Sequence, residues 1–226
     1  ILSSLLLAAG LTAQGNLLGT IPSPGPAPVG IGVVPTTGNL LVVVAAGTVY
    51  EMTQAGTVVT SWSASTNSGI ANGITSDGTN IFITDSSLST GGRGVDVYDM
   101  QGTYVRSFRS AAFYPAGICW VAQTGNLIVI DRTGSAALEY DLQGNLIANI
   151  ALASQHDGIG HDPVSNTSWA YDLTADLIVN YDLAFTAVTS FTGPTGAGLA
   201  AGRGLTYIGG IAFSAVQGAN LIAMFD

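Results

Sequence analysis

Both histidines of the chain fall in one short stretch with two aspartates, and these residue types are common metal ligands. The stretch is residues 156–162, HDGIGHD. Side chains alternate faces along a strand, so His156 and His161 diverge, and Asp157 and His161, on one face, lie roughly 13 Å apart. Zinc requires its ligands within about 2.0 to 2.2 Å of one point. The spacing argues against a metal site, and we expect no cofactor.

A second set of polar residues lies at one position of an internal sequence repeat, where the residue type differs from one repeat to the next. A Gly-Ile or Gly-Leu pair starts each of five repeat units, and the residues just before these pairs are Val29, Asn72, Ala116, Asp157 and Arg203. A residue with a structural task should recur in every repeat, so departure from the repeat is a functional signal. We predict that Asn72, Asp157 and Arg203 form a small polar ligand-binding site. The alternative is that Asp157 and Arg203 simply pair as a salt bridge.

The other candidates for chemistry have structural explanations. Asp85, Asp131 and Asp172 recur at equivalent places, which predicts that they cap backbone N–H groups of the next turn. Cys119 lies in the apolar run 117–121, which predicts a buried and unreactive thiol. The chain has no Gly-x-Ser-x-Gly elbow and no phosphate-binding Gly-x-x-x-x-Gly-Lys. We therefore assign no catalytic residue.

A repeat that runs along the whole chain positions these residues. The marker glycines are about 43, 44, 41 and 46 residues apart: Gly30, Gly73, Gly117, Gly158 and Gly204. The unit at residues 115–150 holds four short apolar runs separated by Gly, Asn and Asp, a pattern typical of four consecutive strands. This period with four strands per unit predicts an all-β fold, a β-propeller of four-stranded antiparallel blades.

The two ends of the chain are complementary. Residues 14–21, QGNLLGTI, match the fourth run of the best unit, residues 143–150, QGNLIANI. The last unit stops at Asp226, where its own fourth run should begin. We predict that the N-terminal strand completes the last blade, giving five blades and no open edge. One repeat phase covers residues 14–226, which we assign to a single propeller domain.

The third unit, with PAGI at 115–118 and GNLIVID at 125–131, resembles the NHL-type and related six-bladed propeller repeat families. The second unit resembles them through residues 72–74 and 81–85. The resemblance implies a propeller that binds partners on one face, and it implies no particular activity. Lactonase-type propellers hold a metal with Glu, Asn and Asp. Here both glutamates, Glu51 and Glu139, are predicted on third strands away from the axis.

Charge is scarce and negative. Charged residues make up 8% of the chain, and five basic against fourteen acidic residues give a net charge of −9. This excess of negative charge argues against nucleic acid and against an anionic membrane surface as partners.

The N-terminal residues 1–13 are apolar and uncharged. They are too few for the roughly 20 that span a bilayer, so we expect no membrane span. They suit a signal-peptide remnant, which predicts export and processing before Gln14. The alternative is a mature hydrophobic helix used for anchoring or assembly.

These observations predict a secreted, extracellular or cell-surface propeller that acts as a non-enzymatic binding or scaffold module for a protein or glycan. The rival prediction is a propeller enzyme, a lyase or lactonase-like hydrolase, working at the mouth of the central channel with Asn72, Asp157 and Arg203. A cluster of carboxylates converging on the axis would favour the enzyme.

Overall fold

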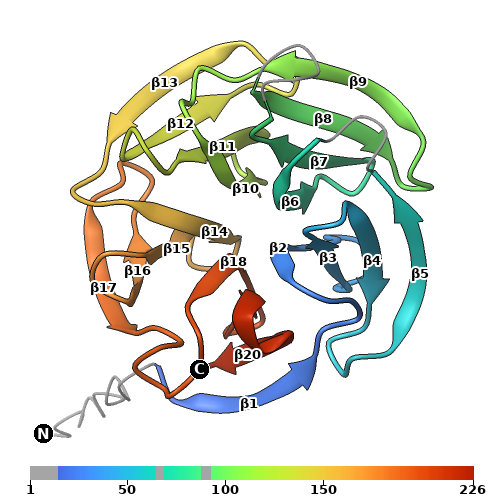
Figure 1. The fold of residues 1–226 in the computed structure, drawn as a ribbon. Helices are drawn as coiled ribbons and strands as arrows, with labels where there is room; N and C mark the ends of the chain where they lie inside the picture. Colours follow the sequence, from blue (N-terminus) through green and yellow to red (C-terminus); the bar gives the residue numbers. More distant parts are fainter. Residues whose placement is uncertain (1–14, 65–68, 88–92) are drawn as a thin grey trace, which may run out of the picture.

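The chain forms a ring of five four-stranded antiparallel sheets, viewed along its axis in Figure 1. The computed structural model describes residues 15–64, 69–87 and 93–226. The predicted signal remnant at residues 1–13, with its processing site before Gln14, lies outside these residues. The prediction of an all-β, five-bladed propeller is confirmed.

Each of the first four blades follows the chain from the axis outwards. Blade 1 contains β2 (Pro28–Val33), β3 (Leu40–Val44), β4 (Thr48–Met52) and β5 (Val58–Ser63). Blade 2 contains β6 (Ala71–Ser76), β7 (Asn80–Asp85), β8 (Gly94–Asp99) and β9 (Tyr104–Arg109). Blade 3 contains β10 (Pro115–Val121), β11 (Asn126–Asp131), β12 (Ala136–Tyr140) and β13 (Leu146–Ala151). Blade 4 contains β14 (His156–Asp162), β15 (Thr167–Asp172), β16 (Leu177–Tyr181) and β17 (Ala187–Thr192).

The fifth blade is built from both ends of the chain. It contains β18 (Gly202–Ile208), β19 (Ile211–Val216), β20 (Leu221–Phe225) and β1 (Leu17–Pro22). A short 3-10 helix, η1 (Gln217–Ala219), joins β19 to β20. No helix within the described residues is long and apolar enough to cross a membrane.

Burial falls from the axis to the rim. All five residues of β3, LLVVV, are buried, as expected for a strand covered on both faces. The outermost strands β5, β9 and β13 are mostly exposed. The core lies between blades: Leu41 and Val43 of blade 1 belong to one apolar cluster with Ile74 and Ile83 of blade 2. Each blade therefore buries its faces against its two neighbours.

The marker glycines are needed because inner-strand backbones touch around the axis. A Cβ atom on Gly73 would lie 2.5 Å from the carbonyl oxygen of Ala116, closer than real side chains approach. Equivalent approaches of 2.3 to 2.5 Å to the next blade's backbone occur at all five markers: Gly30, Gly73, Gly117, Gly158 and Gly204. The register of every inner strand shifts at this place, as at a β-bulge. We call this closed set of contacts the glycine ring.

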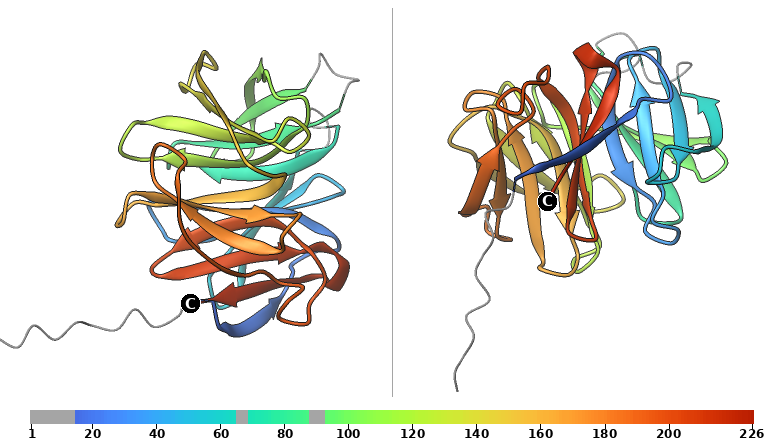
Figure 2. Two further views of the ribbon diagram at one scale, coloured as in Figure 1. Left: turned by 90° about the vertical axis from the view of Figure 1, so that its left-hand side faces the viewer. Right: turned by 90° about the horizontal axis from the view of Figure 1, so that it is seen from below.

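The predicted closure by the N-terminal strand is confirmed. Strand β1 pairs antiparallel with β20, and Ile21 stands opposite Ile222. The Gly15 amide donates to the carbonyl oxygen of Asp226 at 2.5 Å, and the Asp226 amide donates to that of Asn16 at 3.2 Å. In Figure 2, β1 (blue) crosses beside the red strands of the last blade. The edge that β20 would otherwise expose is thereby covered.

The repeated aspartates hold turns, as predicted. Carboxylate oxygens of Asp85 and Asp131 accept from amides in the turn that follows their strand, those of Ser87 and Gly134. They also accept from amides of the loop that leads into the inner strand, Gly69 and Ile70 for Asp85 and Phe113 and Tyr114 for Asp131. Asp172 accepts from the next-turn amides of Thr174 and Ala175. These carboxylates are therefore part of the fold.

Candidate functional site

The residues that precede the marker glycines lie at one end of the axis, where the inner strands begin. A pocket of about 180 Å³ opens there. It brings together Asn72, Asp157 and Arg203, the three residues that the broken repeat symmetry singled out. Six polar side chains line the pocket, which we call the polar mouth: Asn72, Tyr114, Arg132, Asp157, Arg203 and Gln217.

Asp157 is the centre of the charges at the polar mouth. Its Oδ2 lies 3.0 Å from Nη1 of Arg203 and 3.8 Å from Nη1 of Arg132. The Asp157 side chain is only 8% exposed, whereas those of Arg132 and Arg203 are 30% and 34% exposed. Burial raises the pKa of Asp157, and the two guanidinium groups act to lower it. The salt bridge considered from the sequence does form, and its charges face the pocket.

Hydrogen bonds hold the other walls of the polar mouth. The Asn72 amide nitrogen donates to the Pro115 carbonyl oxygen at 3.2 Å, and the Tyr114 hydroxyl donates to the Asn72 amide oxygen at 3.4 Å. Nε of Arg203 donates to Oε1 of Gln217 at 3.2 Å. The Arg132 guanidinium lies over the Tyr114 ring, 5.6 Å from its centroid. Four of the five blades therefore contribute to one connected polar network.

Sequence reasoning missed three members of this site: Tyr114, Arg132 and Gln217. Arg132 and Gln217 each occupy the first position after a second strand, where the other blades carry Ala45, Ser86 and Leu173. Tyr114 directly precedes an inner strand. Asp157 was identified by comparing equivalent positions of the repeats. The same comparison at the position after the second strand would have found Arg132 and Gln217.

The arrangement favours binding of a negative group. Two guanidinium groups face one carboxylate, so one positive charge is left uncompensated. Within the described part of the chain, the Arg132 guanidinium makes no hydrogen bond, and its donors are available. Asp157 is the one carboxylate among the described residues that line this pocket, so the cluster of carboxylates typical of a metal-dependent propeller enzyme is not present at this mouth.

The two histidines lie at opposite ends of β14 and diverge, as the strand geometry predicted. Nδ1 of His156 lies 3.0 Å from the Ser154 carbonyl oxygen, and its Nε2 lies 2.8 Å from the Tyr181 hydroxyl. His161 lies near the other end of the axis, with Nε2 2.8 Å from Oε1 of Gln123. In the described ranges, no three His, Cys, Asp or Glu side chains come close enough to hold a metal ion.

We expect both histidines to make stability depend on pH. Burial lowers the pKa of His156 and of His161, although Asp172 and Asp162 oppose the shift. The unfolded chain therefore takes up protons first, below about pH 6.5. Stability should be complete above that pH and fall as the pH drops through the folded-state values. The urea midpoint of the wild type should be lower at pH 5.5 than at pH 7.5.

The control is the double variant His156→Gln, His161→Gln. Its midpoint should change much less between the same two pH values. The raised pKa of Asp157 acts in the opposite direction, but it is common to both proteins and cancels in the comparison. An equal change in both proteins would contradict the assignment.

Comparisons with known proteins identify the fold. No protein-family model matches the sequence, and no curated protein matches it. The structure is similar to Myxococcus xanthus glutaminyl cyclase, with a TM-score of 0.75 and 15% identity over 94% of this chain and 95% of that one. It is also similar to Staphylococcus aureus virginiamycin B lyase, with a TM-score of 0.55 and 14% identity over 91% and 84% of the two chains. A chain of a nidogen/laminin complex is similar as well, with a TM-score of 0.62 and 20% identity over 88% of this chain and 76% of that one.

Identities this low show the fold alone. The class of protein is a five-bladed β-propeller, and its neighbours include propellers named as a cyclase and a lyase as well as one from a protein complex. The general propeller character implied by the resemblance to NHL-type repeats is confirmed. One fold supports several kinds of function, so the function must be argued from the polar mouth.

Proposed function

We propose that this propeller is an exported, non-enzymatic binding or scaffold module whose polar mouth receives an acidic group of a protein or glycan ligand. One observation carries the proposal: the two guanidinium groups of Arg132 and Arg203 converge on the single carboxylate of Asp157, where the repeat symmetry is broken.

The charge distribution supports an acidic ligand. All five basic residues of the chain are arginines, two of them line this small pocket, and the chain as a whole carries a net charge of −9. A guanidinium group binds a carboxylate through two parallel hydrogen bonds, which fixes orientation as well as charge. About a third of each arginine side chain is exposed, so both cations can be reached from solvent.

Recognition of one acidic group also suits the dimensions of the polar mouth. A pocket of about 180 Å³ is smaller than the roughly 300 to 1,000 Å³ typical of sites that enclose a whole small molecule. The amide of Asn72, the hydroxyl of Tyr114 and the amide of Gln217 surround the arginines and supply neutral donors and acceptors. A terminal carboxylate or an acidic sugar, with the rest of the ligand lying outside, fits this arrangement.

The test is Arg203→Ala. We expect binding of the acidic ligand to fall at least roughly tenfold, because a charge-assisted bidentate contact is lost. Stability should fall by no more than about 1 kcal/mol, because Arg203 is partly exposed and Arg132 still faces Asp157. A glycan array and a protein pull-down with the purified propeller select the ligand. Titration calorimetry and thermal melting then measure the two effects.

Two further variants make this result specific. Arg109→Ala removes the same charge from an exposed rim position and should leave binding unchanged. The double variant Asp157→Asn, Arg203→Ala tests the purely structural alternative. If the single variant melts far below the wild type and the double variant recovers, the pair is a structural salt bridge and the ligand-site proposal is wrong.

The second candidate is a propeller enzyme, a lyase or lactonase-like hydrolase, acting at the same mouth. Burial raises the pKa of Asp157, which is a property of general acids and bases, and two propellers of this fold carry enzyme names. The ion pairs to both arginines weigh against proton transfer by this carboxylate. Lyase, lactonase and glutaminyl cyclase assays of the wild type and Asp157→Asn decide between the candidates. An activity that Asp157→Asn abolishes would establish the enzyme.

A further inference from the structure

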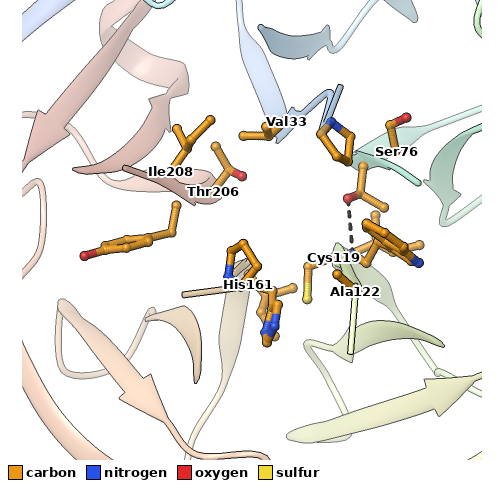
Figure 3. A pocket seen from close by; sticks show the side chains of 14 residues that line it. Val33, Ser76, Cys119, Ala122, His161, Thr206 and Ile208 are labelled. Atoms are coloured by element: carbon orange, nitrogen blue, oxygen red, sulfur yellow. Dashed lines mark hydrogen bonds between the residues drawn. The ribbon is translucent and has the colours of Figure 1, made fainter. Parts of the chain in front are cut away.

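A second and larger pocket lies at the opposite end of the axis, where the inner strands end. It has a volume of about 310 Å³ and receives side chains from all five blades (Figure 3). We call it the apolar mouth, and its walls include Val33, Cys119, Ala122, Ile159, Thr206 and Ile208. It shares no lining residue with the polar mouth, and the glycine ring stands between them. It is therefore a separate site.

The apolar mouth carries no formal charge. No Asp, Glu, Lys or Arg of the described residues lines it. Its one imidazole, His161, is held by Gln123 and by the Ser168 hydroxyl. The Gln123 amide nitrogen donates to the Pro163 carbonyl oxygen, so its Oε1 faces His161 and accepts from an Nε2–H. Burial lowers the pKa of His161, which favours the neutral ring.

The thiol in this pocket is neutral as well. Cys119 is buried, as the sequence predicted, and burial raises the pKa of its thiol to about 12. A charged ligand in this pocket would lose its hydration and find no opposite charge. The lining thus selects uncharged molecules.

Two threonine hydroxyl groups that line the apolar mouth have a donor that no described residue uses. The Thr206 hydroxyl makes no hydrogen bond with any described residue, and Figure 3 shows it turned toward the interior of the pocket. Oγ1 of Thr75 accepts from the Trp120 amide at 3.3 Å, which leaves its hydroxyl hydrogen free to donate. A ligand oxygen beside either hydroxyl group would accept a hydrogen bond that no described residue accepts.

We propose that the apolar mouth binds a small, uncharged, largely apolar molecule that carries one hydroxyl or carbonyl oxygen. The apolar part contacts Val33, Ile118 and Ile159, and the oxygen lies beside the Thr206 hydroxyl. The volume is at the lower end of the roughly 300 to 1,000 Å³ of small-molecule sites, which suits a molecule of one or two rings.

Three matched probes test the ligand chemistry: 2-naphthol, naphthalene and 2-naphthoate. Saturation-transfer NMR and titration calorimetry with the full chain should show that 2-naphthol binds best, that naphthalene binds more weakly, and that 2-naphthoate does not bind. Failure of 2-naphthol to bind up to its solubility limit would overturn the proposal. Equal binding of 2-naphthoate would overturn the claim that the site selects neutral molecules.

Two variants locate the binding. Ala122 is an exposed residue at the rim of the pocket, so Ala122→Trp should fill the entrance, leave the fold intact and weaken 2-naphthol binding at least roughly tenfold. The control Val164→Trp adds the same side chain at a residue that is 91% exposed and outside the pocket, and it should bind like the wild type. Equal affinities in Ala122→Trp and wild type would place the binding elsewhere.

Thr206→Val removes the hydroxyl and keeps the shape of the side chain. Affinity for 2-naphthol should fall about 3- to 10-fold, the effect of one hydrogen bond, and affinity for naphthalene should stay the same. Equal losses for both probes would show that Thr206 acts only through packing and would refute its role in recognising oxygen.

Discussion

Alanine in place of Gly158 is expected to destabilise the propeller by about 3 kcal/mol, or roughly 6 to 12 °C in Tm for a domain of this size. The new Cβ would lie 2.3 Å from the backbone nitrogen of Leu205, where real Cβ atoms essentially never come within 3.0 Å. Because the atom it meets belongs to the main chain, no rotamer change relieves the clash. The inner strands of blades 4 and 5 must move apart, and the glycine ring opens.

Gly19→Ala is the matched control. Gly19 lies in the outermost strand β1, and a Cβ there would meet only Cε of Met224 at an ordinary 3.5 Å. Its Tm should be unchanged or slightly raised, because alanine loses less backbone entropy on folding than glycine does. Differential scanning calorimetry measures both variants. A Gly158→Ala protein that melts with the wild type would contradict the close approach of the inner strands.

The second large effect is expected from removal of β1. A chain that begins at residue 23 loses the strand that covers β20, together with the contact of Ile21 with the apolar cluster around Ile222. The backbone groups of β20 then form an open edge, and open edges pair with other chains. We expect this truncated protein to melt well below the parent and to form oligomers, measured by calorimetry and by size-exclusion chromatography with light scattering.

A chain that begins at residue 15 keeps β1 and is the control for truncation. It should behave like the full chain. A synthetic peptide of residues 15–22 should restore the melting temperature of the shorter chain by adding the missing strand in trans. If the chain beginning at residue 23 stays monomeric and melts like the control, β1 does not close the ring in solution.

Much of the fold follows from short stretches of sequence. The apolar run LLVVV at 40–44 and the turns between runs specify strands from adjacent residues, and the spacing of the marker glycines counts the blades. The match between residues 14–21 and 143–150 predicted ring closure, because a missing strand at one end and a spare strand at the other have one arrangement that leaves no open edge. These features are local or periodic, so they can be predicted from a single sequence.

Only the tertiary structure decided how the sites are composed. Repeat symmetry identified Asn72, Asp157 and Arg203 as neighbours. A comparison of repeat positions marks Arg132 as unusual, but only the structure shows that its guanidinium group approaches Asp157 of the next blade. The sequence also predicted a buried, unreactive Cys119 without showing that it lines a second pocket. Pocket membership depends on how five blades are arranged around one axis. That arrangement is set by the sum of contacts between blades, so the sequence of a single repeat does not specify it.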